Sequence, residues 1–149
     1  MRLIVSLLAI VAALTLLPMP MAAVAQEPGA ADPCEGSTTP EINTCYGNKL
    51  QAAEEVMNRY LHAATLRYAE SGDDGIILGL TESQRAFEAY RDIECGAVHY
   101  RWRDGTIRTV MGLICRIALT DQRTHTIWRT WLTYPDGTQP TLPEPSPTE

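Results

Sequence analysis

Hydrophobic residues recur at helical spacing in three stretches of the chain. In the first stretch, apolar side chains gather on one side of a helical wheel, and Gln51 and Arg59 lie on the other. Thr39 can cap a helix here and Pro40 suits its first position, because proline lacks the N–H that this position leaves unpaired. The pattern predicts an amphipathic helix that ends by Gly72.

Two further helices follow in the same way. The run from Thr81 to Gln84 matches a capping box and predicts a second helix that continues to about Val98. The third helix should begin after a turn, with Thr106 as its cap, and continue to about Thr133. Short connections favour antiparallel neighbours, so we expect an all-α fold, a small antiparallel bundle of three main helices.

The first 25 residues have the pattern of an export signal. Arg2 precedes an apolar run, and Ala23-Val24-Ala25 supplies small residues for cleavage. A membrane anchor is disfavoured, since about fifteen apolar residues span only about 22 Å of a roughly 30 Å hydrocarbon core. A lipid anchor would need a cysteine directly after the apolar run, whereas Cys34 lies well downstream. We expect residues 1–25 to be a signal peptide and the chain to be secreted, soluble and periplasmic.

Both ends of the exported chain differ in composition from its middle. Residues 26–39 form a short, polar N-terminal segment rich in turn formers, and residues 134–149 are rich in proline without apolar periodicity. We expect two mobile ends around one helical domain at 40–133.

The charge of the chain restricts its partners. The formal net charge is −6 at pH 7, and removal of the signal, which holds one basic and no acidic residue, makes it one unit more negative. Nucleic-acid binding depends mainly on basic residues that neutralise phosphates, so we do not expect this acidic chain to bind nucleic acid. An acidic surface instead suits a basic protein partner.

Four cysteines in a short exported chain predict two disulfides. Cys34, Cys45, Cys95 and Cys115 lie at one end of the predicted bundle, without the C-x2-C pair that begins many zinc sites. All three pairings are open. We favour Cys45 with Cys95, which would clamp adjacent helices, and Cys34 with Cys115, which would hold the N-terminal segment. A peptide map that linked Cys34 to Cys45 would overturn this choice.

The sequence L-T-E-S-Q-R-A-F-E-A-Y-R-D-I-E-C at residues 80–95 resembles the lysozyme inhibitor LprI-like N-terminal domain family. The likeness covers about residues 34–132. Phe87 stands where the family often has tryptophan, and Leu61 where it has tyrosine. Further matches are Cys34, Cys45, Met57, Asn58, Gly105, Thr106, Cys115, Thr120 and Arg123.

The resemblance implies a helical envelope domain, and the family is named after a lipid-anchored inhibitor of lysozyme. We expect an exported binding protein that docks on a basic glycan hydrolase, such as a lysozyme, and blocks it. The alternative is a non-inhibitory cell-envelope module that binds another exported protein or cell-wall material. Fold follows from such a resemblance more directly than activity.

Several polar residues lie on the apolar faces of the second and third helices. Gln84 and Arg91 fall within the apolar stripe of the second, and Asp121 and His125 within that of the third. We favour a structural network that fixes helix register, with Gln84 level with Asp121 and hydrogen-bonded to it. The alternative is a groove that presents Arg91 and Asp92 to a partner.

Catalytic and metal-binding patterns are weak. Asp121 and His125 form half a triad, but no nucleophile-elbow sequence accompanies them, so we do not expect an enzyme. The histidines lack the i,i+3 or i,i+4 spacing of a helical metal site, and we expect no metal or cofactor. Trp128 lies on the core stripe, whereas Trp102 and Trp131 are candidates for exposed contacts with a protein partner.

Overall fold

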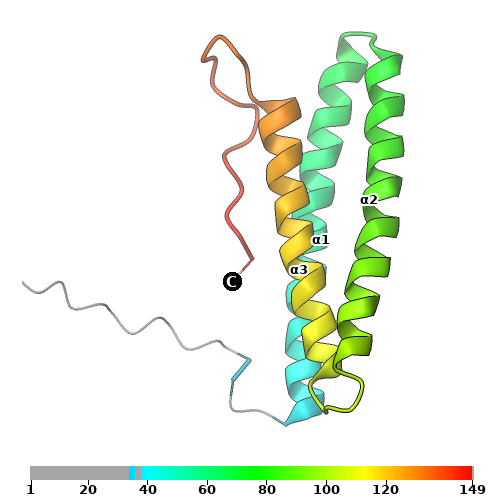
Figure 1. The fold of residues 1–149 in the computed structure, drawn as a ribbon. Helices are drawn as coiled ribbons and strands as arrows, with labels where there is room; N and C mark the ends of the chain where they lie inside the picture. Colours follow the sequence, from blue (N-terminus) through cyan, green and yellow to red (C-terminus); the bar gives the residue numbers. More distant parts are fainter. Residues whose placement is uncertain (1–33, 36–37, 149) are drawn as a thin grey trace, which may run out of the picture. The chain divides into compact units, whose positions relative to one another are not determined.

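A computed structural model describes residues 34–35 and 38–148, which form three helices and a C-terminal extended segment. Helix α1 spans Thr39–Glu70, α2 Asp74–Arg101 and α3 Arg108–Ile127, and a π-helical turn, η1, continues α3 over Trp128–Leu132. Figure 1 shows α1 and α3 running one way and α2 the other. The prediction of an all-α bundle is confirmed, and the described residues contain no strand. The predicted export signal and its cleavage site lie outside the described residues.

Helix α1 begins one residue earlier than we predicted and ends where we predicted. Its N-cap is Thr38, whose backbone N–H and Oγ1 donate to the Glu41 carboxylate at 2.9 and 2.7 Å. At the other end Gly72 has a φ of 71°, a conformation that costs glycine little. The helix ends at Glu70, and glycine suits the turn that follows because a side chain at position 72 would be strained.

The predicted start of α2 at Thr81 is wrong. Asp73 is the N-cap, and its side chain accepts a hydrogen bond from the Ile76 backbone N–H at 3.1 Å. The Thr81 hydroxyl lies inside the helix and donates to the Ile77 carbonyl at 2.9 Å. Burial of Leu80, 1% exposed, extends the helix through this stretch despite its glycines, because packing outweighs local propensity. The helix also continues three residues beyond Val98.

The start of α3 differs from the prediction by one position, since the N-cap is Ile107 rather than Thr106 and makes no side-chain cap bond. The end matches, because η1 stops at Leu132, next to the predicted last residue.

The main core is built mostly by α1, the end of α3 and η1. Met57, Tyr60 and Ala64 from α1 meet Ile127 and Leu132, and Leu80 of α2 closes the cluster. Contacts are most extensive between α1 and α3, then between α2 and α3, and least between α1 and α2. Helix α3 is therefore the element against which both others pack.

The favoured disulfide pairing is wrong. Cys34 is bonded to Cys45 and Cys95 to Cys115. Cys34 lies in a turn just before α1 and folds back onto its second turn, so the N-terminal segment is tied to its own helix. Cys95 faces Cys115 because α2 packs more extensively against α3 than against α1.

Residues 134–148 were expected to be mobile, but in the structure they pack against the bundle. The segment turns at Gly137, φ 81°, and runs back along α3 (Figure 1). Leu142 packs on the core cluster, and the Trp128 indole N–H donates to the Leu142 carbonyl at 3.0 Å. Composition predicts disorder from the scarcity of apolar residues, but the bundle contacts this segment at Leu142, at two main-chain carbonyls, and at the side chains of Glu144 and Thr148.

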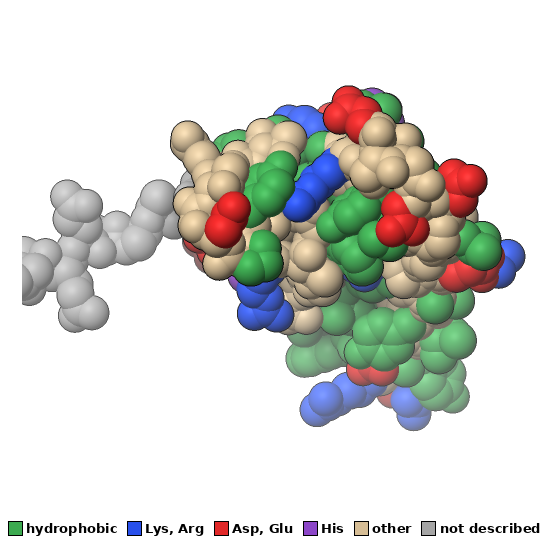
Figure 2. All heavy atoms as spheres, turned by 90° about the horizontal axis from the view of Figure 1, so that it is seen from above, with side chains coloured by type: hydrophobic (Ala, Val, Ile, Leu, Met, Phe, Trp, Pro, Cys, Tyr) green, Lys and Arg blue, Asp and Glu red, His purple; other side chains and the backbone are tan. Residues whose placement is uncertain are grey.

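Figure 2 looks onto the bundle from the end with the α1–α2 turn, where hydrophobic, basic and acidic side chains are interspersed. Hydrophobic side chains also reach the surface farther along the bundle. Among the described helices, none has the length and apolar composition required to span a bilayer.

Candidate functional site

Arg91 joins all three helices. Its side chain on α2 donates from Nη1 to Thr120 Oγ1 of α3 at 2.7 Å, and Nη2 pairs with Glu54 Oε1 of α1 at 2.9 Å. The residue is 8% exposed, and its guanidinium also lies over the Phe87 ring, 5.6 Å from the centroid. A buried cation needs such partners, and these contacts are compatible with the structural network that we favoured for Arg91; its role in fixing helix register stays a prediction.

Gln84 is also buried, but its partner is not the one predicted. Its Oε1 accepts a hydrogen bond from Arg123 Nε at 3.1 Å, and its Nε2 donates to Glu88 at 2.9 Å. The Nη2 of Arg123 donates a second hydrogen bond, to Ser83 Oγ at 2.9 Å. Burial lowers the pKa of the Arg123 guanidinium. The predicted bond to Asp121 is wrong because the longer side chain of Arg123, two residues on, occupies the position opposite Gln84.

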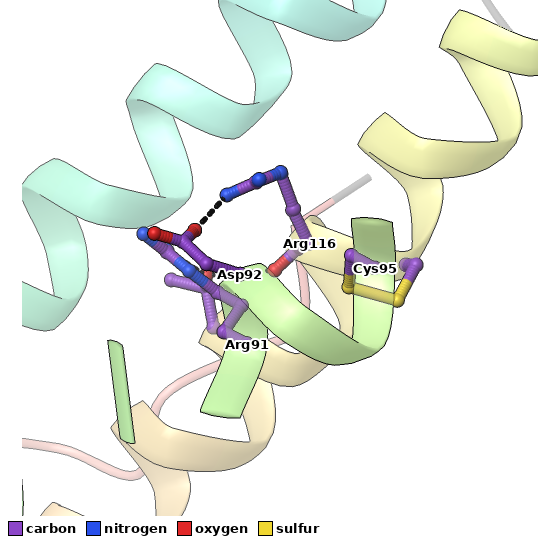
Figure 3. The surroundings of a disulfide bond; sticks show 6 residues. Arg91, Asp92, Cys95 and Arg116 are labelled. Atoms are coloured by element: carbon purple, nitrogen blue, oxygen red, sulfur yellow. Dashed lines mark hydrogen bonds and ion pairs between the residues drawn. A yellow bond between two sulfur atoms is a disulfide. The ribbon is translucent and has the colours of Figure 1, made fainter. Parts of the chain in front are cut away.

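Asp92 and Arg116 form an ion pair between α2 and α3, beside the Cys95 disulfide (Figure 3). Figure 3 shows the two side chains pointing toward each other while Arg91 lies close by. The Asp92 side chain is 62% exposed, in contrast to the buried Arg91. These neighbours in sequence therefore differ in character, and of the two only Asp92 is accessible to a partner.

Sequence reasoning missed the residues that complete this network, Glu54, Glu88 and Arg116. Glu54 could have been found, since it follows the fully buried Ala53 on the edge of the apolar side of α1. Arg116 could not, because its partner is fixed only by the packing of α2 on α3.

Asp121 and His125 both contact the C-terminal segment. The Asp121 carboxylate accepts hydrogen bonds from the Thr148 N–H and hydroxyl at 2.9 and 2.7 Å. His125 Nε2 lies 2.9 Å from a carboxylate oxygen of Glu144. Both residues therefore belong to a surface of α3 that binds an extended chain.

The tryptophans are placed partly as expected. Trp102 is 37% exposed at the C-terminal end of α2. Trp131 is half-buried, and its ring meets that of Tyr68 edge-on at 5.8 Å between centroids. Trp128 packs on the core cluster as predicted. Trp102 is thus the more accessible of the two proposed contact residues.

Helix α2 has a second apolar side, which we call the outer face of α2. Tyr90, Ile93 and Tyr100 are 52%, 76% and 67% exposed, respectively, and they stand on one stripe with Ala86 and Ala97. The stripe lies opposite the buried residues of the helix. The spacing of positions 90, 93, 97 and 100 indicates this second stripe in the sequence, beside the buried stripe on which the prediction rested. Two exposed carboxylates lie on or beside this face, those of Glu82 and Glu94.

Comparison with known proteins identifies the helical domain. The model of the family described as lysozyme inhibitor LprI matches residues 31–127, which include all of α1, α2 and α3. No curated protein and no solved structure shows significant similarity to the chain. The π-helical turn and the C-terminal segment lie outside the matched residues.

Proposed function

Because the chain belongs to the lysozyme inhibitor LprI family, we propose that it binds a basic glycan hydrolase of the lysozyme type and blocks it. The outer face of α2 is the single observation that carries this proposal. Its exposed side chains are of the kinds that dominate the energetics of protein interfaces, and they are not used by the fold.

The chemistry of this face suits a basic partner. Tyr90 and Ile93 supply apolar area at its centre, and Glu94 lies next to them with an exposed side chain. The chain as a whole carries a net charge of −6. Acidic groups around an apolar centre would attract a basic hydrolase, while the apolar contacts would set the lifetime of the complex.

The fold holds this face rigidly. The Cys95–Cys115 disulfide and the Arg91–Thr120 hydrogen bond fasten α2 to α3. A rigid helix loses little conformational entropy when it binds, so more of the contact energy appears as affinity. We infer that α2 enters the substrate cleft as a preformed ridge and excludes the glycan.

The test is inhibition of peptidoglycan lysis by a lysozyme in the presence of the exported, oxidised chain. We expect inhibition at stoichiometric amounts that weakens with added salt. Tyr90→Ala and Ile93→Ala should each raise the inhibition constant roughly tenfold or more. Leu66→Ala is the matched control, because Leu66 is an apolar side chain on α1 with 50% exposure.

Two results would count against the proposal. If the folded, oxidised protein leaves lysis unchanged at low salt, it does not inhibit the lysozymes that were assayed. If Leu66→Ala weakens inhibition as much as Ile93→Ala does, the protein is an inhibitor but the outer face of α2 is not its binding site.

A further inference from the structure

A groove between α1 and the C-terminal part of α3 holds an extended segment of this chain, residues 141–148, which belongs to no β-sheet and which we call the strand. The strand begins where the Thr141 N–H donates to the Leu132 carbonyl at 3.4 Å. It ends beside Asp121, which binds Thr148. Figure 1 shows it descending along α3. We call this surface the strand groove, and its main walls are Tyr60, Asp121, His125 and Trp128.

The strand groove recognises main-chain atoms. The Tyr60 hydroxyl donates to the Pro143 carbonyl at 2.8 Å, and the Trp128 indole N–H donates to the Leu142 carbonyl at 3.0 Å. These donors come from α1 and η1 and bind consecutive carbonyls. Every peptide offers carbonyls, and proline keeps a strand extended while lacking an N–H that would need a partner. Aromatic grooves with such donors are a known mode of binding proline-rich segments.

The groove is larger than the contacts of its own strand require. A pocket of about 500 Å³ lies between the strand and α3, lined by Ala118, Asp121, Gln122 and His125 on the helix side. A second pocket of about 310 Å³ continues past Thr148 toward Tyr46 and Ile114. Bulkier side chains than those of Pro145 and Ser146 would fit against α3.

We propose that the strand groove is a binding site for an extended, proline-containing segment of another polypeptide, and that residues 141–148 fill it when that partner is absent. Strand contacts through carbonyls do not require this particular sequence. A tethered strand acts at an effective concentration on the order of millimolar, so a partner must use the additional pockets to displace it. This site is distinct from the outer face of α2 and does not depend on lysozyme binding.

The full-length chain tests the proposal directly, with a fluorescent peptide of residues 139–148 as the probe. Leu142→Asp should release the chain's own strand, because a carboxylate cannot pack on the core cluster. We expect this variant to bind the probe roughly tenfold or more tightly than wild type does. Leu142→Ser is a second release variant in case the first disturbs the fold.

The two donors are then removed one at a time, and the two prolines of the probe together. In the Leu142→Asp background, Tyr60→Phe and Trp128→Phe should each weaken probe binding about fivefold, the effect of one hydrogen bond. Thr81→Val removes a hydroxyl from α2, which forms no wall of the strand groove, and should leave probe binding unchanged. A probe carrying Pro143→Gly and Pro145→Gly should bind several-fold more weakly, because it is less preorganised.

Three outcomes would overturn the proposal. One is failure of both release variants to bind the probe. Another is equal binding by wild type and Leu142→Asp, which would place the probe elsewhere. The third is a concentration-dependent dimer of wild type that Leu142→Asp abolishes, which would identify the strand of a second copy as the occupant.

Discussion

The Arg91 guanidinium and the Thr120 hydroxyl join α2 to α3 through a buried hydrogen bond of 2.7 Å. The Thr120 hydroxyl is also bound to its own helix, since it donates to the Arg116 carbonyl at 2.7 Å. Arg91 thereby connects to α3 at a fixed point and to Glu54 of α1 at the same time. A sliding of either helix by one turn would leave the guanidinium buried without these partners, so we expect this one side chain to set the register of the three helices.

Removal of Arg91 should therefore weaken the fold markedly. We expect Arg91→Ala to lower the free energy of unfolding by about 2 to 4 kcal/mol, because Glu54 and Thr120 lose their partner and a cavity forms. Urea denaturation measures this change. Arg85→Ala is the control, since Arg85 forms an exposed pair with Glu82, and pairs of that kind contribute about 0 to 1 kcal/mol. Equal effects of the two substitutions would show that Arg91 does not hold the helices in register.

The helical bundle could be predicted from the sequence because its information is local. Apolar periodicity marks α1 and α3, and Gly72 marks the end of α1. Gln84 and Arg91 could be identified as buried for the same reason, since a polar residue on an apolar stripe is visible on a wheel. Their partners could not be read in this way, because a shift of two residues between helices exchanges Asp121 for Arg123.

The errors arose where tertiary packing decides. The choice among three disulfide pairings depends on which helices lie closest. The preference for Cys45 with Cys95 took the first two helices as the pair to be clamped, whereas α2 packs more extensively on α3. The start of α2 depends on the burial of Leu80, which outweighs the capping box at Thr81. The C-terminal segment is held by donors from distant elements, and no local pattern records them.

The disulfide pairing makes a prediction of its own. Proteolysis of the oxidised chain without reductant should give fragments that link Cys95 to Cys115 and Cys34 to Cys45. Replacing Cys95 and Cys115 together by alanine should lower the free energy of unfolding by about 3 kcal/mol. In the chain-entropy model the loss arises because the unfolded chain gains conformational freedom without the bridge. The Cys34 and Cys45 bridge closes a shorter loop, 11 positions against 20, so its loss should cost slightly less. A fragment joining Cys45 to Cys95 would contradict this pairing.

The first turn of α1 should respond to acid. The Thr38 backbone N–H, and then its hydroxyl, lower the pKa of Glu41 from the usual 4.5. A lowered pKa in the folded state means that the carboxylate stabilises the helix start above about pH 4.5, and that this effect is lost as the pH falls through the lowered value. An NMR titration of the Glu41 carboxyl measures it. Thr38→Ala should raise this pKa only part of the way, because the backbone donor remains, whereas a wild-type pKa at or above 4.5 would rule out the cap.

Two glycines in neighbouring helices should respond differently to alanine. Gly96 on α2 has nothing within 4 Å of an added Cβ, so Gly96→Ala should raise the free energy of unfolding by about 0.5 to 1 kcal/mol. Gly112 on α3 lies against α2, and an added Cβ would come within 3.3 Å of the His99 Cβ and 3.7 Å of the Cys95 carbonyl oxygen. Alanine favours the helical conformation at position 112 as it does at position 96, but α3 must then move away from α2.

Urea denaturation of the two variants measures how closely α2 and α3 approach. We expect Gly112→Ala to be less favourable than Gly96→Ala by about 1 kcal/mol or more, the usual cost of adding a methyl group to a packed contact. The backbone of α2 cannot yield easily at this point because the Cys95–Cys115 bridge fixes its distance from α3. Equal stabilisation by both substitutions would mean that the helices are separated more widely here than the contact of Gly112 with His99 indicates.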